Sequence, residues 1–284
     1  MSGPADDGAP HAPTTAGASA SARGSPASAS AVALAARSLG IAAGERLLVS
    51  EMSVEFRAGE VTAILGRNGS GKTLTLHTLA GLRRPQQGVV RLDGAPLDHL
   101  RRRAIAQRLG VLLQDLEESF TSTALEAVLI GRHPHLPSWQ WETADDERLA
   151  RDALARVQME AFAARSTDKL SGGERRRVAV ASLLAQAPQV FLLDEPTNHL
   201  DPHHQIAVLE LFRAQANAGR TVIATLHDAT LAARFADRVI LLFGDGRWRE
   251  GPMRQTLTAD ALSELYLTRI IEIDTPDRRV FVSA

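Results

Sequence analysis

The stretch that decides the fold of this chain reads Gly66-Arg67-Asn68-Gly69-Ser70-Gly71-Lys72-Thr73. It fits the pattern G-x-x-x-x-G-K-[ST], in which glycines let the backbone curl around phosphate oxygens where a Cβ would not fit. The apolar run 61–65 before it has the length of a buried strand, and residues 74–80 after it indicate a helix that ends at Gly81. This order points backbone N–H groups and the positive end of a helix dipole at one place. The stretch therefore predicts a site for a nucleoside triphosphate, with Lys72 on the β- and γ-phosphates and the Thr73 hydroxyl on Mg²⁺.

Composition and charge exclude several classes of protein. The 284 residues are 44% hydrophobic and 23% charged, which is typical of a soluble globular protein with an ample core. A formal net charge of −1 gives no reason to expect nucleic acid as a partner, and the absence of cysteine excludes disulfides and thiolate metal sites. No apolar run approaches the roughly 18 residues of a membrane-spanning helix, and the N-terminus lacks the pattern of a signal peptide. We therefore expect a cytosolic protein that meets a membrane only through a partner.

The order of apolar and polar segments predicts an α/β fold. Residues 1–30 hold almost no large apolar side chain and are expected to form a disordered Ala/Ser-rich tail. Residues 32–56 indicate an antiparallel hairpin with its turn at Gly44-Glu45. Further on, apolar strands alternate with helices, which predicts a mostly parallel sheet covered on both faces. Another short strand with a turn is expected at 88–94. The alternating strands are expected at 110–113, 190–193, 221–226 and 238–243, and the helices at 98–109, 172–187, 202–218 and 229–235.

The stretch 115–170 interrupts this alternation. Residues 122–131 and 143–165 have helical periodicity and are separated by a segment rich in proline and histidine. We therefore expect a helical subdomain inserted into a main domain that covers residues 31–255. Residues 256–284 are predicted to form a short helix and a terminal hairpin, to which we assign no chemistry.

Two acidic residues follow a buried strand. Asp194 and Glu195 come directly after the apolar residues 190–193. Carboxylates in such a place are usually paired or bind a metal. We predict that Asp194 holds Mg²⁺ next to Thr73, directly or through water, and that Glu195 is the general base that polarises the attacking water. The alternative is a strand that simply emerges into solvent.

A second phosphate-binding surface is predicted at Leu170-Ser171-Gly172-Gly173-Glu174. Ser171 and Glu174 have the spacing of a capping box, which by itself would only start a helix. Two glycines inside the box lower helix propensity, however, and they expose backbone N–H groups that can bind an anion.

The Leu-Ser-Gly-Gly-Glu segment resembles the signature motif of the ATP-binding cassette (ABC) ATPases. The family's other motifs follow in its order, and the resemblance covers residues 33–255. The ordered set is the phosphate loop at 66–73, Gln114, the signature at 170–174, Asp194-Glu195, Asn198-His199-Leu200-Asp201 and His227. The set is much more specific than any single motif, and it implies a P-loop NTPase core with an N-terminal antiparallel β subdomain and an inserted α-helical subdomain.

The resemblance also implies how the site works. Two copies would face each other head to tail, with each ATP held between the phosphate loop of one copy and the signature of the other. Asp201 would couple the two sites across the dimer, His227 would contact the γ-phosphate, and Gln114 would sense Mg²⁺ and signal to the helical subdomain. Because the partner supplies half of the charge stabilisation, ATP binding would close the dimer and hydrolysis would release it.

One position departs from the family pattern. Members usually stack adenine on an aromatic residue in the first hairpin, at a position that falls near Ala43 here, and no Phe, Trp or Tyr precedes Phe56. We therefore predict weak adenine discrimination and a looser affinity for ATP.

Other histidine and arginine groups are expected to carry no site chemistry. His133 with His135, and His203 with His204, lack the spacing of a ligand pair on one helix face and have no obvious acidic or thiol partner. The runs expected to be solvated helix surface are His203-His204, Arg101-Arg102-Arg103 and Arg175-Arg176-Arg177.

A single cassette without spanning helices most resembles the separate ATPase subunit of a bacterial importer. The segments 130–136, 198–205, 227–228 and 232–235 are similar to those of the group that serves ferric siderophores, haem and vitamin B12. That similarity implies a homodimer peripheral to the cytoplasmic face of the inner membrane. It also implies permease subunits that dock around residues 116–137 and a periplasmic binding protein that acts indirectly.

Two rival functions are weighed against this one. The first is a soluble ABC ATPase that acts with a cytosolic partner such as an Fe–S assembly scaffold. The second is a nucleotide-gated module that does not hydrolyse ATP, which the presence of Glu195 and His227 disfavours.

Overall fold

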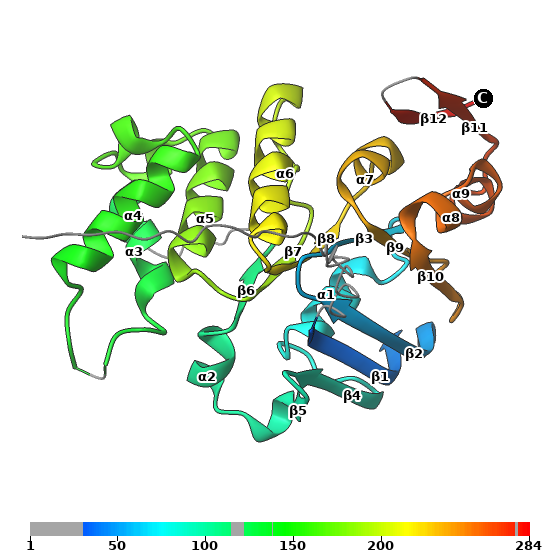
Figure 1. Cartoon of the computed structure of the whole chain (residues 1–284), viewed down its shortest axis with the longest axis horizontal. Helices are drawn as coiled ribbons and strands as arrows, with labels where there is room; N and C mark the ends of the chain where they lie inside the picture. Colours follow the sequence, from blue (N-terminus) through cyan, green and yellow to red (C-terminus); the bar gives the residue numbers. More distant parts are fainter. Residues whose placement is uncertain (1–30, 115–121, 138, 276–277) are drawn as a thin grey trace, which may run out of the picture.

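The computed structural model describes residues 31–114, 122–137, 139–275 and 278–284, so the tail predicted at 1–30 lies outside the described residues. Its central element is a six-stranded sheet in the order β10-β9-β3-β8-β7-β6 (Figure 1). The strands are β3 (Val61–Gly66), β6 (Leu109–Leu112), β7 (Val190–Leu193), β8 (Thr221–Thr225), β9 (Arg238–Leu242) and β10 (Trp248–Pro252). All pairs are parallel except β10 with β9, which confirms the predicted, mostly parallel sheet and adds an edge strand that was not predicted.

Both faces of this sheet are buried because each packs against a different layer. On β3, Ala63 and Leu65 belong to one apolar cluster while Ile64 between them belongs to the other. The first cluster includes residues of α5 (Gly172–Gln186), α6 (Pro202–Asn217) and α7 (Ala229–Phe235). The second cluster includes residues of α1 (Lys72–Leu79) and of the antiparallel sheet.

The antiparallel sheet has the order β2-β1-β4-β5. Its strands are β1 (Val32–Ala43), β2 (Arg46–Arg57), β4 (Gln87–Leu92) and β5 (Ala95–Pro96). The β1–β2 pair is the predicted hairpin, with Gly44 at its turn in the left-handed region (φ 60°), where glycine has no Cβ penalty.

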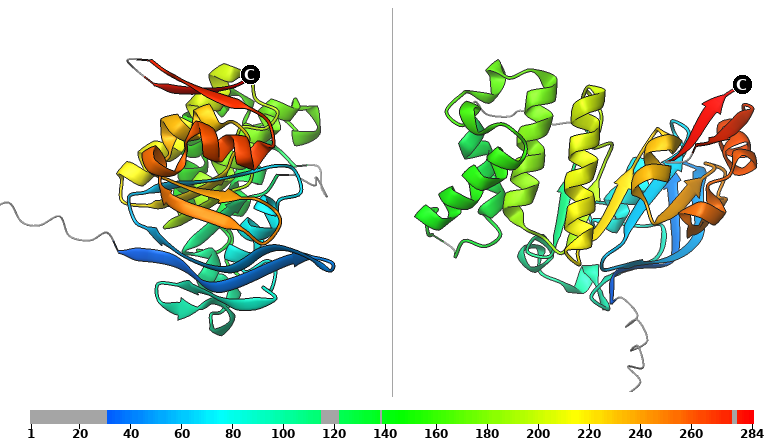
Figure 2. Two further views of the ribbon diagram at one scale, coloured as in Figure 1. Left: turned by 90° about the vertical axis from the view of Figure 1, so that its right-hand side faces the viewer. Right: turned by 45° about the horizontal axis from the view of Figure 1, so that its top comes forward.

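Helices α3 (Ala124–Leu129) and α4 (Ala144–Arg156) pack on α5 at one end of the molecule (Figures 1 and 2). The helix predicted over 143–165 is wrong beyond Arg156. The chain turns at Gln158, which has φ 58°, so that Met159 is fully buried, and it continues through the 3₁₀ segments Glu160–Phe162 and Thr167–Lys169. Burial of Met159 outweighs continuation of the helix.

The helix predicted over 98–109 is also wrong. A 3₁₀ turn covers Leu97–His99, α2 covers only Arg102–Ala106, and the chain between them is extended at Leu100. Leu109 is the first residue of β6 and pairs with Val190, so it belongs to the sheet and not to a helix. Tertiary burial overrides local helix propensity here.

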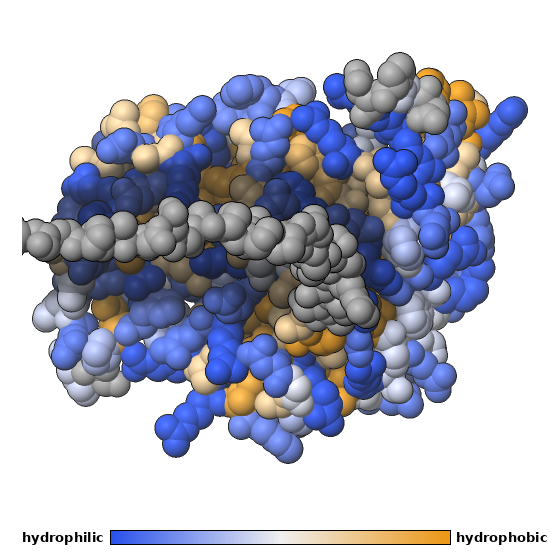
Figure 3. Space-filling view, in the orientation of Figure 1, coloured by the Kyte–Doolittle hydropathy of each residue, from blue (hydrophilic) through white to orange (hydrophobic). Residues whose placement is uncertain are grey.

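The chain after β10 forms α8 (Met253–Thr256), α9 (Ala259–Tyr266) and the predicted hairpin of β11 (Ile270–Asp274) and β12 (Arg279–Ser283), at the opposite end of the molecule from α3 and α4 (Figures 1 and 2). In the described part of the chain, none of the helices is long and apolar enough to cross a membrane. The face drawn in Figure 3 is coloured mainly as hydrophilic residues.

Candidate functional site

The phosphate loop, residues 66–73, joins β3 to α1 at the carboxyl end of the sheet. Gly71 has φ 100°, and a Cβ on it would lie 3.2 Å from the Leu48 side chain, so only glycine fits there. Gly71 is also the N-cap of α1 and provides no side-chain cap, which leaves N–H groups of the first turn available to an anion.

Lys72 is buried and folds back over this loop. Its Nζ donates to the carbonyl oxygen of Gly66 (3.0 Å) and lies 3.4 Å from that of Arg67. Burial lowers the pKa of the Lys72 ammonium, while the carboxylates of Glu195 and Asp194 act in the opposite direction. A cation is therefore held in place before any phosphate arrives.

A pocket of ≈ 550 Å³ opens above the loop. It brings together residues that are far apart in the sequence and that the motifs predicted to share a site. The lining residues are Ala43, Leu48, Asn68, Gly69, Gly71, Lys72, Thr73, Leu74, Gln114, Glu195, Asn198 and His227. The hairpin therefore contributes Ala43 and Leu48 to the pocket and no aromatic ring.

Glu195 lies at the centre of a set of hydrogen bonds in this pocket. Asn198 Nδ2 donates to its Oε2 (3.0 Å), and His227 Nε2 contacts its Oε1. Its backbone N–H donates to Thr225 Oγ1 (2.8 Å). Glu195 has φ 47°, a conformation that a non-glycine residue keeps only when its surroundings hold it there. The carboxylate is thus buried, oriented and at the edge of the phosphate pocket.

Asp194 lies behind Glu195 and is fully buried. Its Oδ1 accepts a hydrogen bond from Thr225 Oγ1 (2.7 Å), whereas its Oδ2 is buried and has no hydrogen-bond partner among the residues that the structure describes. His77 Nε2 lies 4.0 Å from this oxygen. A buried carboxylate oxygen without a donor is suited to a cation or its water ligand. Sequence reasoning missed Thr225. The available signal was a polar residue at the end of a buried strand, β8, which follows in the chain the strand that leads into the two acids.

The signature, residues 170–174, has both of the features that the sequence suggested. Ser171 and Glu174 form a capping box at the start of α5, and hydrogen bonds from Ser171 lower the pKa of the Glu174 carboxyl. A Cβ placed on Gly172 would meet no atom within 4 Å, so the backbone here faces open space. None of the signature residues lines the phosphate pocket of the same chain.

Asp201 is the N-cap of α6 and is exposed. Its Oδ1 accepts from the backbone N–H of His204 (2.9 Å), and this hydrogen bond, followed by one from the His204 ring, lowers the pKa of the Asp201 carboxyl. His203 is solvated as expected, but the expectation is wrong for His204, because the ring is largely covered and bonded to Asp201.

The expectation for the arginine run 175–177 is also wrong at its middle residue. Arg176 is 2% exposed, and its guanidinium donates to backbone carbonyl groups of two strand ends, including those of Asp194 and Glu195. A run of three arginines suggests a charged surface. Successive residues of a helix point in different directions, however, and residue 176 faces the core.

His133 and His135 each contact a group within the described part of the chain. His133 lies 3.5 Å from a Glu142 carboxylate oxygen, and the His135 ring bonds the carbonyl oxygen of Gln186. Among the described residues, no group of three or more His, Cys, Asp or Glu side chains is arranged to hold a metal ion.

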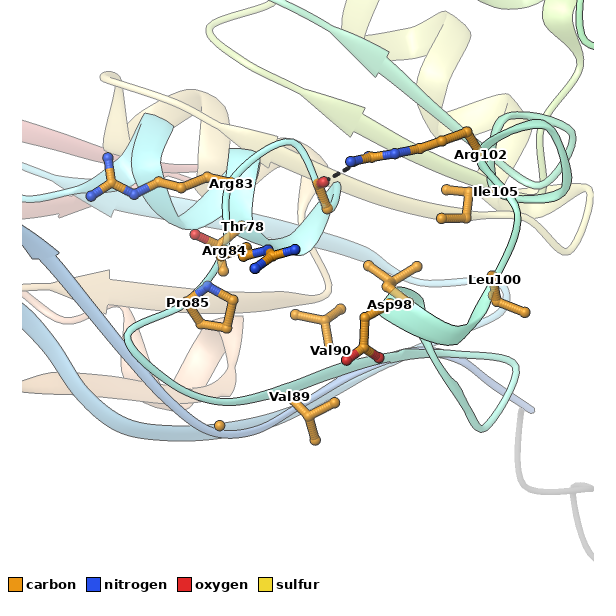
Figure 4. A pocket seen from close by; sticks show the side chains of 13 residues that line it. Thr78, Arg83, Arg84, Pro85, Val89, Val90, Asp98, Leu100, Arg102 and Ile105 are labelled. Carbon is orange, nitrogen blue, oxygen red and sulfur yellow. Dashed lines mark hydrogen bonds between the residues drawn. The ribbon is translucent and has the colours of Figure 1, made fainter.

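A second cavity, of ≈ 440 Å³, lies between the end of α1, β4 and α2 (Figure 4). Two of its arginines already bond backbone: Arg102 donates to Gly81 (2.9 Å) and Arg83 to Ala42 (2.7 Å). Figure 4 shows the Arg83 side chain pointing away from Val90 and Asp98. None of the predicted site residues lines this cavity, so the pocket above the phosphate loop is the candidate site.

The chain belongs to the ABC transporter family, whose sequence pattern matches residues 49–198. It is 41% identical over 245 residues to the hemin import ATP-binding protein HmuV of Streptomyces coelicolor, covering 85% of each chain. It is 37% identical to the ferric enterobactin transport ATP-binding protein FepC of Escherichia coli, covering 82% of this chain and 86% of that one. It is 39% identical to the cobalamin import ATP-binding protein BtuD of Halobacterium salinarum, covering 80% of this chain and 57% of that one.

A solved structure supports the same assignment. The dimeric structure of MJ0796, a bacterial ABC transporter cassette, superposes with a TM-score of 0.68 at 27% identity, covering 78% of this chain and 99% of that one. The predicted ABC ATPase fold is therefore confirmed, and the chain is an ATPase of the importer group.

Proposed function

We propose that this chain is the ATP-hydrolysing subunit that energises uptake of an iron chelate, haem or a siderophore, or of cobalamin, through a separate permease. The names of the relatives support this range of cargo, and the subunit that selects the cargo is a different one. The observation that carries the proposal of hydrolysis is the buried Glu195 carboxylate, oriented by Asn198 and His227 at the edge of the phosphate pocket.

The residues of the pocket fit an in-line attack on the γ-phosphoryl group. The loop N–H groups and Lys72 would hold the phosphates and stabilise their charge. Glu195 would accept a proton from the attacking water, and His227, which now bonds Glu195, would turn to the γ-phosphate. Positioning and charge stabilisation supply most of the rate in such a reaction.

The oxygen atoms near the pocket fit Mg²⁺. Thr73 and Gln114 line the pocket, and the buried Oδ2 of Asp194 has no donor among the described residues. A hard cation with a preference for oxygen ligands would be held by these three side chains, and it would neutralise charge on the β- and γ-phosphates.

A homodimer would complete the site. The signature lies outside its own chain's pocket, and the space in front of Gly172 is open, as a surface for the partner's ATP requires. Asp201, exposed at the start of α6, would couple the two sites. The dimeric form of the related cassette MJ0796 supports this arrangement.

The permease would dock on the helical subdomain, around residues 116–137, of which 116–121 lie outside the described residues. The proposed division of the chain is a main domain at 31–255, with the helical subdomain at 115–170 inserted in it, and an extension at 256–284. The assembled subunit would be peripheral on the cytoplasmic face of the inner membrane, and a periplasmic binding protein would act on it only through the permease.

Replacement of Glu195 by glutamine tests the proposal. Glu195→Gln keeps the size of the side chain and one acceptor oxygen but removes the base, so ATP turnover should fall by roughly 10²–10⁴-fold while ATP binding persists. Glu210→Gln, an exposed change on α6, is the control. Unchanged hydrolysis in Glu195→Gln would exclude Glu195 as the base.

A further inference from the structure

Arg176 is a buried cation at the junction of three elements. It belongs to α5, the helix whose N-terminus carries the signature, and it is 2% exposed. The helical repeat places it on the same side as Val180 and Leu184, which are also buried. The core-facing side of the signature helix therefore begins with a guanidinium.

The guanidinium spans the ends of two neighbouring strands. Nη1 donates to the carbonyl oxygen of Leu113 and lies 3.4 Å from that of Gln114, just after β6. Nη2 donates to the carbonyl oxygens of Asp194 (2.5 Å) and Glu195 (2.8 Å), just after β7. Strands β6 and β7 are adjacent and parallel, so these carbonyl groups lie at the same edge of the sheet.

A guanidinium suits this place because one rigid group has to donate to carbonyl oxygens after β6 and after β7 at the same time. Arginine presents its N–H donors in a fixed plane, whereas lysine offers a single point charge and glutamine a single amide nitrogen. Glu195 is in the left-handed region and is bonded at both sides of its residue, by Arg176 at its carbonyl oxygen and by Thr225 at its N–H. The Glu195 carbonyl oxygen also accepts from the Asn198 N–H (3.1 Å), so loss of Arg176 keeps this local turn but removes the bond that ties the strained residue to α5.

We propose that Arg176 is a positioning residue for hydrolysis: it fixes the backbone of Gln114 and Glu195 to the signature helix, so that a displacement of α5 reaches both residues of the same chain's pocket. The inference rests on the proposed function of Glu195. In the dimer, the signature of one chain meets the ATP of its partner, and Arg176 connects that contact to the chain's own general base.

The experiment compares Arg176→Gln and Arg176→Lys with Arg220→Gln. Arg220 is the matched control because its Nη1 donates to the carbonyl oxygen of Pro188 (2.6 Å), just before the other end of β7. Neither replacement at 176 can bridge both strand ends, so kcat for ATP should fall on the order of 10²-fold, as expected for a displaced catalytic group. The Kd of a fluorescent ATP analogue should stay close to the wild-type value, and Arg220→Gln should keep kcat.

Two results would overturn the inference: a wild-type kcat in Arg176→Lys, or a loss in both variants no greater than in Arg220→Gln. If Arg176→Gln does not fold, hydrogen exchange in Arg176→Lys gives the answer, because the amides of Asp194, Glu195, Thr197 and Asn198 should exchange about tenfold faster or more while those of β9 stay unchanged. Equal exchange in both regions would also overturn it. Equal hydrolysis by the wild type and Glu195→Gln would instead refute the proposed function itself.

Discussion

At the scale of single residues, one hydroxyl holds both acids of the site. Thr225 Oγ1 donates to Asp194 Oδ1 and accepts from the Glu195 N–H. Both partners are buried, so neither can exchange this hydroxyl for water at low cost. The same strand provides a contrast in Thr221, whose buried hydroxyl has no hydrogen-bond partner among the described residues.

Valine at these two positions should therefore have opposite consequences. Thr225→Val keeps the shape but leaves a buried carboxylate oxygen and an N–H unpaired, which should lower the free energy of unfolding by about 1–3 kcal/mol. Thr221→Val should be neutral or stabilising. Urea denaturation of both variants, with ATP turnover measured alongside, checks this; equal destabilisation would mean that the Thr225 hydroxyl has no special part.

A second prediction at this scale concerns the nucleotide base. Ala43 lines the pocket at the end of β1, where the family usually offers an aromatic ring. Ala43→Tyr should tighten ATP binding about tenfold, because a base stacked on an aromatic side chain gains roughly 1–3 kcal/mol. Leu47→Tyr, exposed on β2 and absent from the pocket lining, is the control.

Competition between ATP and GTP in the wild type measures the starting point. We expect the two nucleotides to bind with similar affinity. A strong preference for ATP in the unmodified chain would show that another group reads adenine.

At the scale of elements, three helices begin with a capping box: the signature helix α5 and the helices α3 and α4 of the helical subdomain. The boxes of α3, α4 and α5 start at Thr123, Thr143 and Ser171. The box of α4 has an additional partner, because Asp146 also bonds Arg132 Nε (2.9 Å) in a largely buried pair. Hydrogen bonds from Thr143 and then from Arg132 lower the pKa of the Asp146 carboxyl from 3.8 to about 2.

This shift predicts a pH dependence of stability. Because the folded pKa is depressed, the Asp146 carboxylate stabilises the fold above pH 3.8, and that stabilisation is lost as the pH falls toward 2. At pH 7, Asp146→Asn should lower the free energy of unfolding by about 1–3 kcal/mol, and the difference from the wild type should shrink below pH 3.8. Thermal melts from pH 7 to pH 3 measure it, with the exposed Asp145→Asn as control. A difference that does not vary with pH would contradict the assignment.

Element boundaries show where sequence reasoning stops. The hairpin of β1 and β2 and the strands β7 to β9 follow strong patterns and were predicted. The helices at 98–109 and 143–165 were predicted too long, because burial of Leu109 in the sheet and of Met159 in the core is a long-range effect.

At the scale of the whole molecule, the proposed reaction centre would be divided between two chains. The signature does not line the phosphate pocket of its own chain. In a dimer, the phosphate pocket of one copy would face the signature of the other. Association should therefore depend on ATP, since a ligand that binds only the closed form stabilises it.

Sedimentation of Glu195→Gln measures that dependence. Without nucleotide the variant should sediment as a monomer, and with ATP and Mg²⁺ it should shift to a dimer, because the ATP is bound and not cleaved. The same variant with ADP is the control. Full-rate hydrolysis by a wild-type chain that stays monomeric would refute the shared site and the coupling to a permease with it.

The sequence by itself determined the order of the motifs and the residue types that suit a phosphate and its metal ion, because the glycines, Lys72 and the two acids have few other uses at that spacing. It could not determine which side of α5 Arg176 faces, that His227 bonds Glu195, or that Thr225 holds both acids. These are contacts between segments far apart in the chain. Only the packing of helices and strands around one sheet edge brings them within hydrogen-bonding distance, so only the tertiary structure decided them.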